Sequence, residues 1–139
     1  MKSATLALSI SATSLASFVL AYFYHLTMGN AEQYTALIAV VFVDGFFGII
    51  AGTKKYGFQT CKALKVLQTA VVWIILLTTI LVIEKGFSAA SWLSETILIP
   101  FIVFQLISAL KNASMAGFIK AGLLNDILDR IDKHKGDRI

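Results

Sequence analysis

Residues 34–52 read YTALIAVVFVDGFFGIIAG, an apolar run that contains one charged side chain, Asp44. A helix of about 20 apolar residues is long enough to cross the hydrocarbon core of a bilayer. Glu32 precedes the run, and Lys54 and Lys55 follow it closely. The stretch therefore predicts a membrane-spanning helix with charged residues at both ends.

Three other stretches resemble it in length and apolarity, and short loops separate them. We expect four spans, at about residues 4–26, 34–52, 66–83 and 92–110. The first is the weakest, because serine and threonine are scattered through it. A cleaved signal peptide is the rival interpretation, but the apolar run continues past any Ala-x-Ala-like site. The sequence predicts an all-α membrane protein, with a bundle of about four transmembrane helices in residues 1–110.

The composition supports this fold class. Of the 139 residues, 58% are hydrophobic and 14% are charged, whereas roughly a quarter of a soluble domain is charged. The net charge of +4 does not indicate nucleic acid, because the basic residues flank the apolar runs. Membrane lipid is the partner that such flanking charges favour.

The basic residues also predict an orientation. Of the 12 lysines and arginines, Lys85 alone falls in the loops on one side. The loop between the second and third spans begins and ends with lysines: Lys54, Lys55, Lys62 and Lys65. Cytoplasmic loops carry the excess of lysine and arginine. We therefore expect a multi-pass protein with both termini in the cytoplasm.

Residues 111–139 are predicted to form a cytoplasmic amphipathic tail. Leu124, Ile127, Leu128 and Ile131 follow the spacing of a helix with one apolar face. The positions between them are charged or polar, so this helix is too polar to span. It either lies on the membrane, pairs with a copy of itself, or serves as a partly frayed solubilising tail.

Asp44 is the most unusual residue of the predicted spans. A carboxylate near the centre of a bilayer costs about 2.5–3.5 kcal/mol on insertion scales, so it needs a polar partner or water. Two interpretations stay open, a polar lining of a pore or gate and a structural hydrogen bond between helices. The expected partners of Asp44 are hydroxyls of the first span, Gln68 or Thr69 in the third span, and Gln105 in the fourth. The other intramembrane polar candidates are Ser11, Ser14, Gln68 and Gln105.

Small residues favour close helix contact. Gly45, Gly48 and Gly52 are the helix-packing candidates, and the last two form a Gly-x-x-x-Gly pair. The serine- and alanine-rich first helix is also suited to close packing within one subunit. Alternatively, it lines water once many subunits assemble.

The sequence shows no catalytic, metal-binding or cofactor-binding constellation. His25, His134 and Cys61 lack the spacing of metal ligands, and neither a Ser-His-Asp set nor a nucleotide-binding loop is found. We therefore expect a protein that is not an enzyme and that needs no cofactor.

Several short motifs follow one another in a characteristic order. They are Asp44-Gly45, Gly48-Ile49-Ile50-Ala51, Lys54 with its basic loop, the span from Val66, Ser108 to Asn112, and Gly117 before the amphipathic end. This order resembles the toxin-secretion/phage-lysis holin family. The resemblance covers about residues 37–131, and Lys111 and the lack of a proline after Gly117 depart from the family pattern.

The resemblance implies a homo-oligomer that permeabilises the bacterial cytoplasmic membrane. A cognate endolysin or a large toxin would then be released through the lesion. Two alternatives come from other classes of protein. One is a small proton-coupled transporter that uses Asp44, although such transporters carry their essential carboxylate in the first helix. The other is a structural membrane subunit that docks a partner through its tail.

Overall fold

The computed structural model describes the backbone of residues 2–136 and, within them, the side chains of residues 13–134 and 136. This part of the chain is helical and contains no strand, which confirms the predicted all-α membrane fold. Its elements, in order, are α1 (Lys2–Gly29), α2 (Ala31–Tyr56), α3 (Thr60–Gly86), the 3-10 turn η1 (Ser88–Ala90), α4 (Leu93–Met115) and α5 (Ala121–Gly136).

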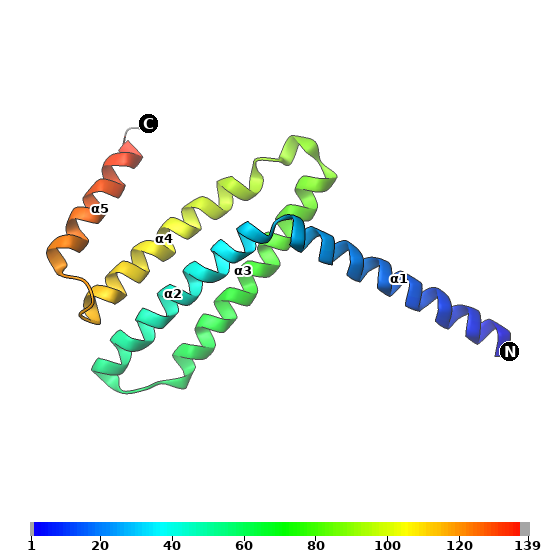
Figure 1. Cartoon of the computed structure of the whole chain (residues 1–139), viewed down its shortest axis with the longest axis horizontal. Helices are drawn as coiled ribbons and strands as arrows, with labels where there is room; N and C mark the ends of the chain where they lie inside the picture. Colours follow the sequence, from blue (N-terminus) through cyan, green and yellow to red (C-terminus); the bar gives the residue numbers. More distant parts are fainter. Residues whose placement is uncertain (1, 137–139) are drawn as a thin grey trace.

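Helices α2, α3 and α4 lie side by side and form the bundle (Figure 1). Short connections at residues 57–59 and 87–92 reverse the chain, so α2 and α4 run in the same direction with α3 antiparallel to both. The Trp73 and Phe101 rings stack with centroids 3.5 Å apart and join α3 to α4. Two clusters of buried side chains form the core, one of Leu26, Tyr34, Leu37, Leu77, Leu81 and Leu98, the other of Val40, Val41 and Ala70.

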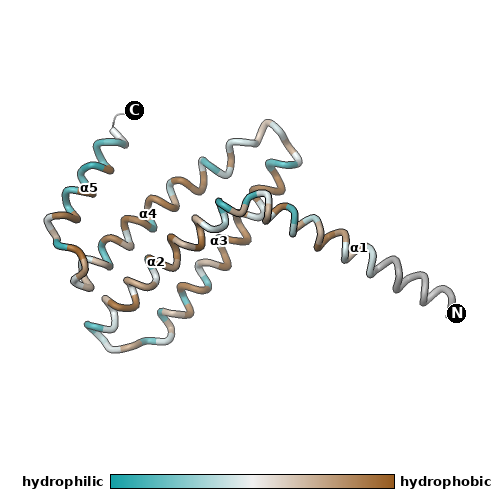
Figure 2. The backbone as a smooth tube through the Cα atoms, in the orientation of Figure 1, coloured by the Kyte–Doolittle hydropathy of each residue, from teal (hydrophilic) through white to brown (hydrophobic). Residues whose placement is uncertain are grey.

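Three segments of the described chain are long and apolar enough to cross a membrane: Ala31–Tyr56, Thr60–Gly86 and Ser88–Met115. Within the most apolar part of each, only 22% of the residues are buried. Figure 2 shows hydrophobic residues along most of the length of these helices. The bundle therefore leaves most of its apolar surface for lipid or for other proteins, as expected of membrane helices.

The predicted span at residues 4–26 falls on α1, which extends away from the bundle (Figure 1). Its described side chains are almost all exposed as far as His25, and Leu26 alone is completely buried against the bundle. Residues 4–12 of this span lie outside the part whose side chains are described. A fourth span therefore stays a prediction beside the three segments found.

A side-chain hydrogen bond joins the end of α3 to the start of α4. Oε1 of Glu84, near the end of α3, accepts a 2.6 Å hydrogen bond from the backbone N–H of Ser94 in the first turn of α4. The first N–H groups of a helix have no partner within it, and a carboxylate there also interacts favourably with the helix dipole. Glu84 thus takes the place of a capping side chain, which α4 itself does not supply.

The last two helices differ from their predicted bounds. Helix α4 continues past residue 110 to Met115, because the polar side chain of Asn112 packs against α2 instead of ending the helix. The amphipathic tail helix is then α5, which begins at Ala121 after a turn at residues 116–120.

Candidate functional site between α2 and α4

Asp44 lies near the middle of α2 on the side that α4 covers. The side-chain Nδ2 of Asn112 donates a hydrogen bond of 2.9 Å to Oδ1 of Asp44, and both residues are half-buried. Lipid offers no hydrogen-bonding partner, so an unpaired polar group at this depth is costly. The bond gives both side chains a partner within one chain and fixes which faces of α2 and α4 meet.

Three glycines of α2 allow close approach of its neighbours, and Gly48 lies beside this bond. A Cβ atom at Gly48 would lie 3.3 Å from Nδ2 of Asn112, so the missing side chain makes room for the amide. Gly45 faces α3 instead, where a Cβ would overlap the side chain of Val66. Gly52 also faces α3, with the Lys62 ammonium in the space of its missing Cβ. The two glycines of the Gly48-x-x-x-Gly52 pair therefore pack against different helices, Gly48 against α4 and Gly52 against α3.

Lys54 lies at the end of the α2–α4 interface where α4 ends. Its Nζ donates to the backbone carbonyl of Ala116, directly after the last residue of α4. A cation at this position satisfies a carbonyl that has no partner within the helix and interacts favourably with the helix dipole. Lys54 therefore joins the end of α4 to α2, in addition to its predicted part in the orientation of the protein.

The turn that follows α4 has the hydrogen bonds of a Schellman motif. The N–H of Phe118 donates to the carbonyl of Ala113, and the N–H of Gly117 to that of Ser114. Gly117 has φ +87°, a conformation that only glycine adopts without strain. The Phe118 ring lies 5.7 Å from that of Phe47 on α2. The turn is thus held to α2 by an aromatic contact and by Lys54.

Two of the remaining lysines of the basic loop lie near an aromatic ring. The Nζ atoms of Lys55 and Lys62 lie 5.2 and 5.5 Å from the centroid of Tyr56, within the range of a cation–π interaction. Lys65 is exposed on α3. The lysines predicted to be cytoplasmic therefore gather at the end of the bundle where α2 meets α3, close to the end of α4.

The other polar candidates are spread over several helices. Ser14 is exposed on α1, Gln68 is exposed on α3, and Gln105 is half-buried on α4. Ser11 lies outside the residues whose side chains are described. The expected partners of Asp44 were hydroxyls of α1, Gln68 or Thr69, and Gln105. The Thr69 hydroxyl instead donates to the Lys65 carbonyl, and Asp44 accepts from Asn112.

Sequence reasoning missed Asn112 because it falls after Lys111, beyond the apolar run that defined the fourth span. One signal was present, since Asn112 ends the Ser-x-x-x-Asn segment that resembles the holin family. A hydrogen bond between Tyr34 and Thr78, 2.8 Å long between their hydroxyl oxygens, was also missed. No sequence pattern pairs these two residues, and only the packing of α2 on α3 brings them together.

Among the described residues, no group of three or more histidine, cysteine, aspartate or glutamate side chains is placed to hold a metal ion. What this site provides is a hydrogen bond between two helices, close backbone contact at glycines and a charged helix cap.

Comparison with known proteins gives a family for the chain. A family model described as the bacteriophage holin family matches residues 19–133, which include the whole α2–α4 bundle and most of α5. Searches of curated proteins and of solved structures gave no significant match. The matched region contains Asp44, Asn112 and Gly117, which carried the resemblance in the sequence. With most of its length matched, the chain belongs to the bacteriophage holin family.

Proposed function

We propose that this protein accumulates in the bacterial cytoplasmic membrane, assembles into homo-oligomers and permeabilises that membrane. The lesion would let a cognate endolysin reach the cell wall, or let a large toxin leave the cell. The observation that carries this proposal is the holin-family match over residues 19–133, on a chain with three membrane-length apolar segments.

The exposed surfaces of the bundle support self-association. Phe42 and Phe46 on α2 and Ile75 on α3 are at least half exposed, although the helices that carry them are long enough to span. Lipid solvates such faces as well as protein does, so contacts between copies depend on packing rather than on a hydrophobic driving force. Association of this kind rises with the density of the protein in the membrane.

Asp44 contributes to the proposed function through the fold of the subunit. Because its carboxylate accepts a hydrogen bond from Asn112 of the same chain, it supports α2–α4 packing, the structural one of its two interpretations. The subunit then enters the assembly as a defined unit with apolar outer faces.

The charges at the two ends of the bundle support an orientation. Lys54 and Lys55 at the end of α2 and Lys62 at the start of α3 lie at one end of the bundle. The other end carries three glutamates, at the start of α2, the end of α3 and the start of α4: Glu32, Glu84 and Glu95. The excess of lysine predicts that the first end is cytoplasmic. With α1 as a fourth span, the N-terminus and the C-terminus both lie on the side with the lysines.

The experiment that tests the function is controlled expression in bacteria. The membrane potential and the entry of an impermeant dye are followed as the amount of protein in the membrane increases. We expect no change below a threshold amount, then abrupt depolarisation and dye entry together. A Gly45→Val variant at the same membrane level is the matched control, because it disturbs the bundle without changing the charge.

If growth slows gradually in proportion to expression, and equally for the parent and the Gly45→Val variant, the effect is only the burden of a membrane protein. Steady growth with proton-coupled efflux would indicate a transporter. Either outcome contradicts the proposed permeabilisation.

A further inference from the structure

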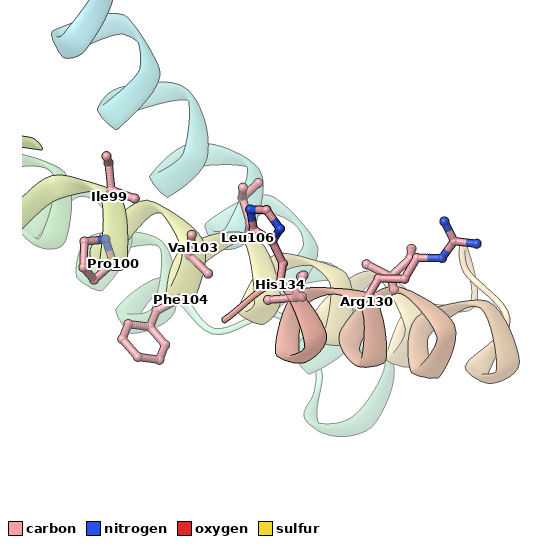
Figure 3. A pocket seen from close by; sticks show the side chains of 9 residues that line it. Ile99, Pro100, Val103, Phe104, Leu106, Arg130 and His134 are labelled. Atoms are coloured by element: carbon pink, nitrogen blue, oxygen red, sulfur yellow. The ribbon is translucent and has the colours of Figure 1, made fainter. Parts of the chain in front are cut away.

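Helix α5 does not extend away from the end of α4 but folds back along it (Figure 1). Between the two helices lies an apolar groove of about 630 Å³ (Figure 3). Its α4 side is formed by residues of the segment Ile99–Leu106, and its α5 side by Ile127, Arg130, Ile131 and His134. The second half of α5 therefore lies beside the middle of α4.

The middle of α4 is also the middle of a membrane-length segment. Ser88–Met115 is apolar and long enough to span, and its inner end is marked by Gly117 and by the Lys54 contact to Ala116. Residues 99–106 are thus far from both ends of the span. With Ser88–Met115 as a span, this arrangement places the second half of α5 at the depth of the hydrocarbon.

The two faces of α5 differ, although Arg130 and His134 line the groove beside its isoleucines. Ile127, Leu128 and Ile131 are half-buried, and two of them line the groove toward α4. The opposite positions are exposed and charged: Asp126, Asp129, Asp132 and Lys133. Hydrocarbon cannot solvate several charged groups on one helix face, so charged residues at membrane depth face protein or water. This arrangement of α5 requires water along its outer face.

We propose that α5 folded against α4 is the water-facing wall of the assembled lesion. This inference rests on the proposed permeabilising function and names the surface that would carry it. The large exposed side chains of α2 and α3 within the predicted spans are mostly apolar, with Gln68 as an exception, and Asp44 is bonded to Asn112 inside the subunit. Of the described helices that pack along the bundle, α5 is the one with a continuous charged face.

The connection between α4 and α5 permits a second position. Residues 116–120 are not helical, and the Schellman motif at Gly117 fixes only the end of α4. Before assembly, α5 rests on the inner surface of the membrane, where its apolar face enters the interface and its charges stay in water. Assembly brings water to the depth of α4, and α5 then folds against Ile99–Leu106.

Cysteine cross-linking in proteoliposomes tests this position. In a Cys61→Ser background, Val103→Cys is combined with Ile131→Cys, because both positions line the groove. The matched control combines Val103→Cys with Asp129→Cys, which lies on the same turn of α5 but on its exposed face. A short bis-maleimide is added below and above the protein density at which the vesicles release an impermeant dye. Each variant must release the dye as the Cys61→Ser parent does.

We expect several-fold more cross-link for the 103/131 pair than for the 103/129 pair, and only in leaking vesicles. In the same vesicles, a fluorophore at residue 129 should be quenched by iodide and not by a quencher at the centre of the acyl chains. Leaking vesicles with equal cross-linking of the two pairs would overturn the inference and leave the proposed function intact. A 103/131 cross-link of equal yield without leakage would also overturn it. Vesicles that never leak would remove the proposed function, and the inference with it.

Discussion

The α2–α4 interface and helix α1 are both built from sequence suited to a membrane, yet they are held very differently. The interface has the Asp44–Asn112 hydrogen bond, the close approach at Gly48 and the Lys54 cap on α4. Helix α1 has one completely buried anchor among its described side chains, Leu26, and extends away from the bundle (Figure 1).

This difference shows what fixes the arrangement of helices in lipid. Apolarity places a segment in the membrane, but it does not choose a neighbour, because lipid and leucine are equally apolar. The defined contacts of the bundle involve glycines, amides, a carboxylate and stacked rings. In the described part of α1, the hydroxyls of Ser17 and Thr27 donate to carbonyls of the same helix, so they hold it to nothing else.

The largest effect is expected inside the bundle, at Gly45. A Cβ there overlaps the side chain of Val66, so Gly45→Val should lower the free energy of unfolding by about 3 kcal/mol, the upper part of the range for overpacking. Unfolding by sodium dodecyl sulfate in mixed micelles measures it. Gly29→Val is the control, because nothing lies within 4 Å of a Cβ at that position. Gly45→Ala should recover stability when combined with Val66→Ala; no recovery would mean that this contact does not limit the packing.

A smaller effect is expected at the single anchor of α1. Leu26 is completely buried, whereas Leu15 on the same helix is 66% exposed. Leu26→Ala leaves a cavity and should cost about 2 kcal/mol, the low end for buried leucine, because lipid contacts replace part of what is lost. Leu15→Ala should cost almost nothing. Unfolding measurements on the two variants compare them, and the distance between spin labels on α1 and α3 reports undocking. An equal loss of unfolding free energy in the two variants would mean that Leu26 makes no specific contact that holds α1 to the bundle.

The sequence predicted those features that depend on apolar length and on charge. The spans at residues 34–52, 66–83 and 92–110 fall within α2, α3 and the segment ending at Met115, because each is a continuous apolar run. The helices are longer than the runs, since polar residues such as Lys54 and Glu84 continue a helix beyond the hydrocarbon.

The partners of individual side chains could not be predicted in the same way. Asp44 was expected to pair with hydroxyls of α1 or with glutamines, because the apolar pattern placed Asn112 outside the fourth span. Its partner depends on how far α4 continues and on which face it turns toward α2. The fold-back of α5 was also not predicted, since an amphipathic pattern shows two faces without showing what the apolar one covers.

The smallest expected effect is at Asp44, and it separates packing from pore lining. Asp44→Ala and Asn112→Ala should each cost about 1 kcal/mol, the scale of an interhelical hydrogen bond in a membrane. The double variant should cost little more than either one, because both remove the same 2.9 Å bond. Asp44→Asn keeps an oxygen that can accept from Asn112 and should lie close to the parent. Asp44→Ala should leave the amount of protein in the membrane unchanged, but it should change the protein density at which vesicles leak. If the two costs add fully, or if Asp44→Asn abolishes leakage while stability is kept, then the charge of Asp44 acts outside the α2–α4 interface.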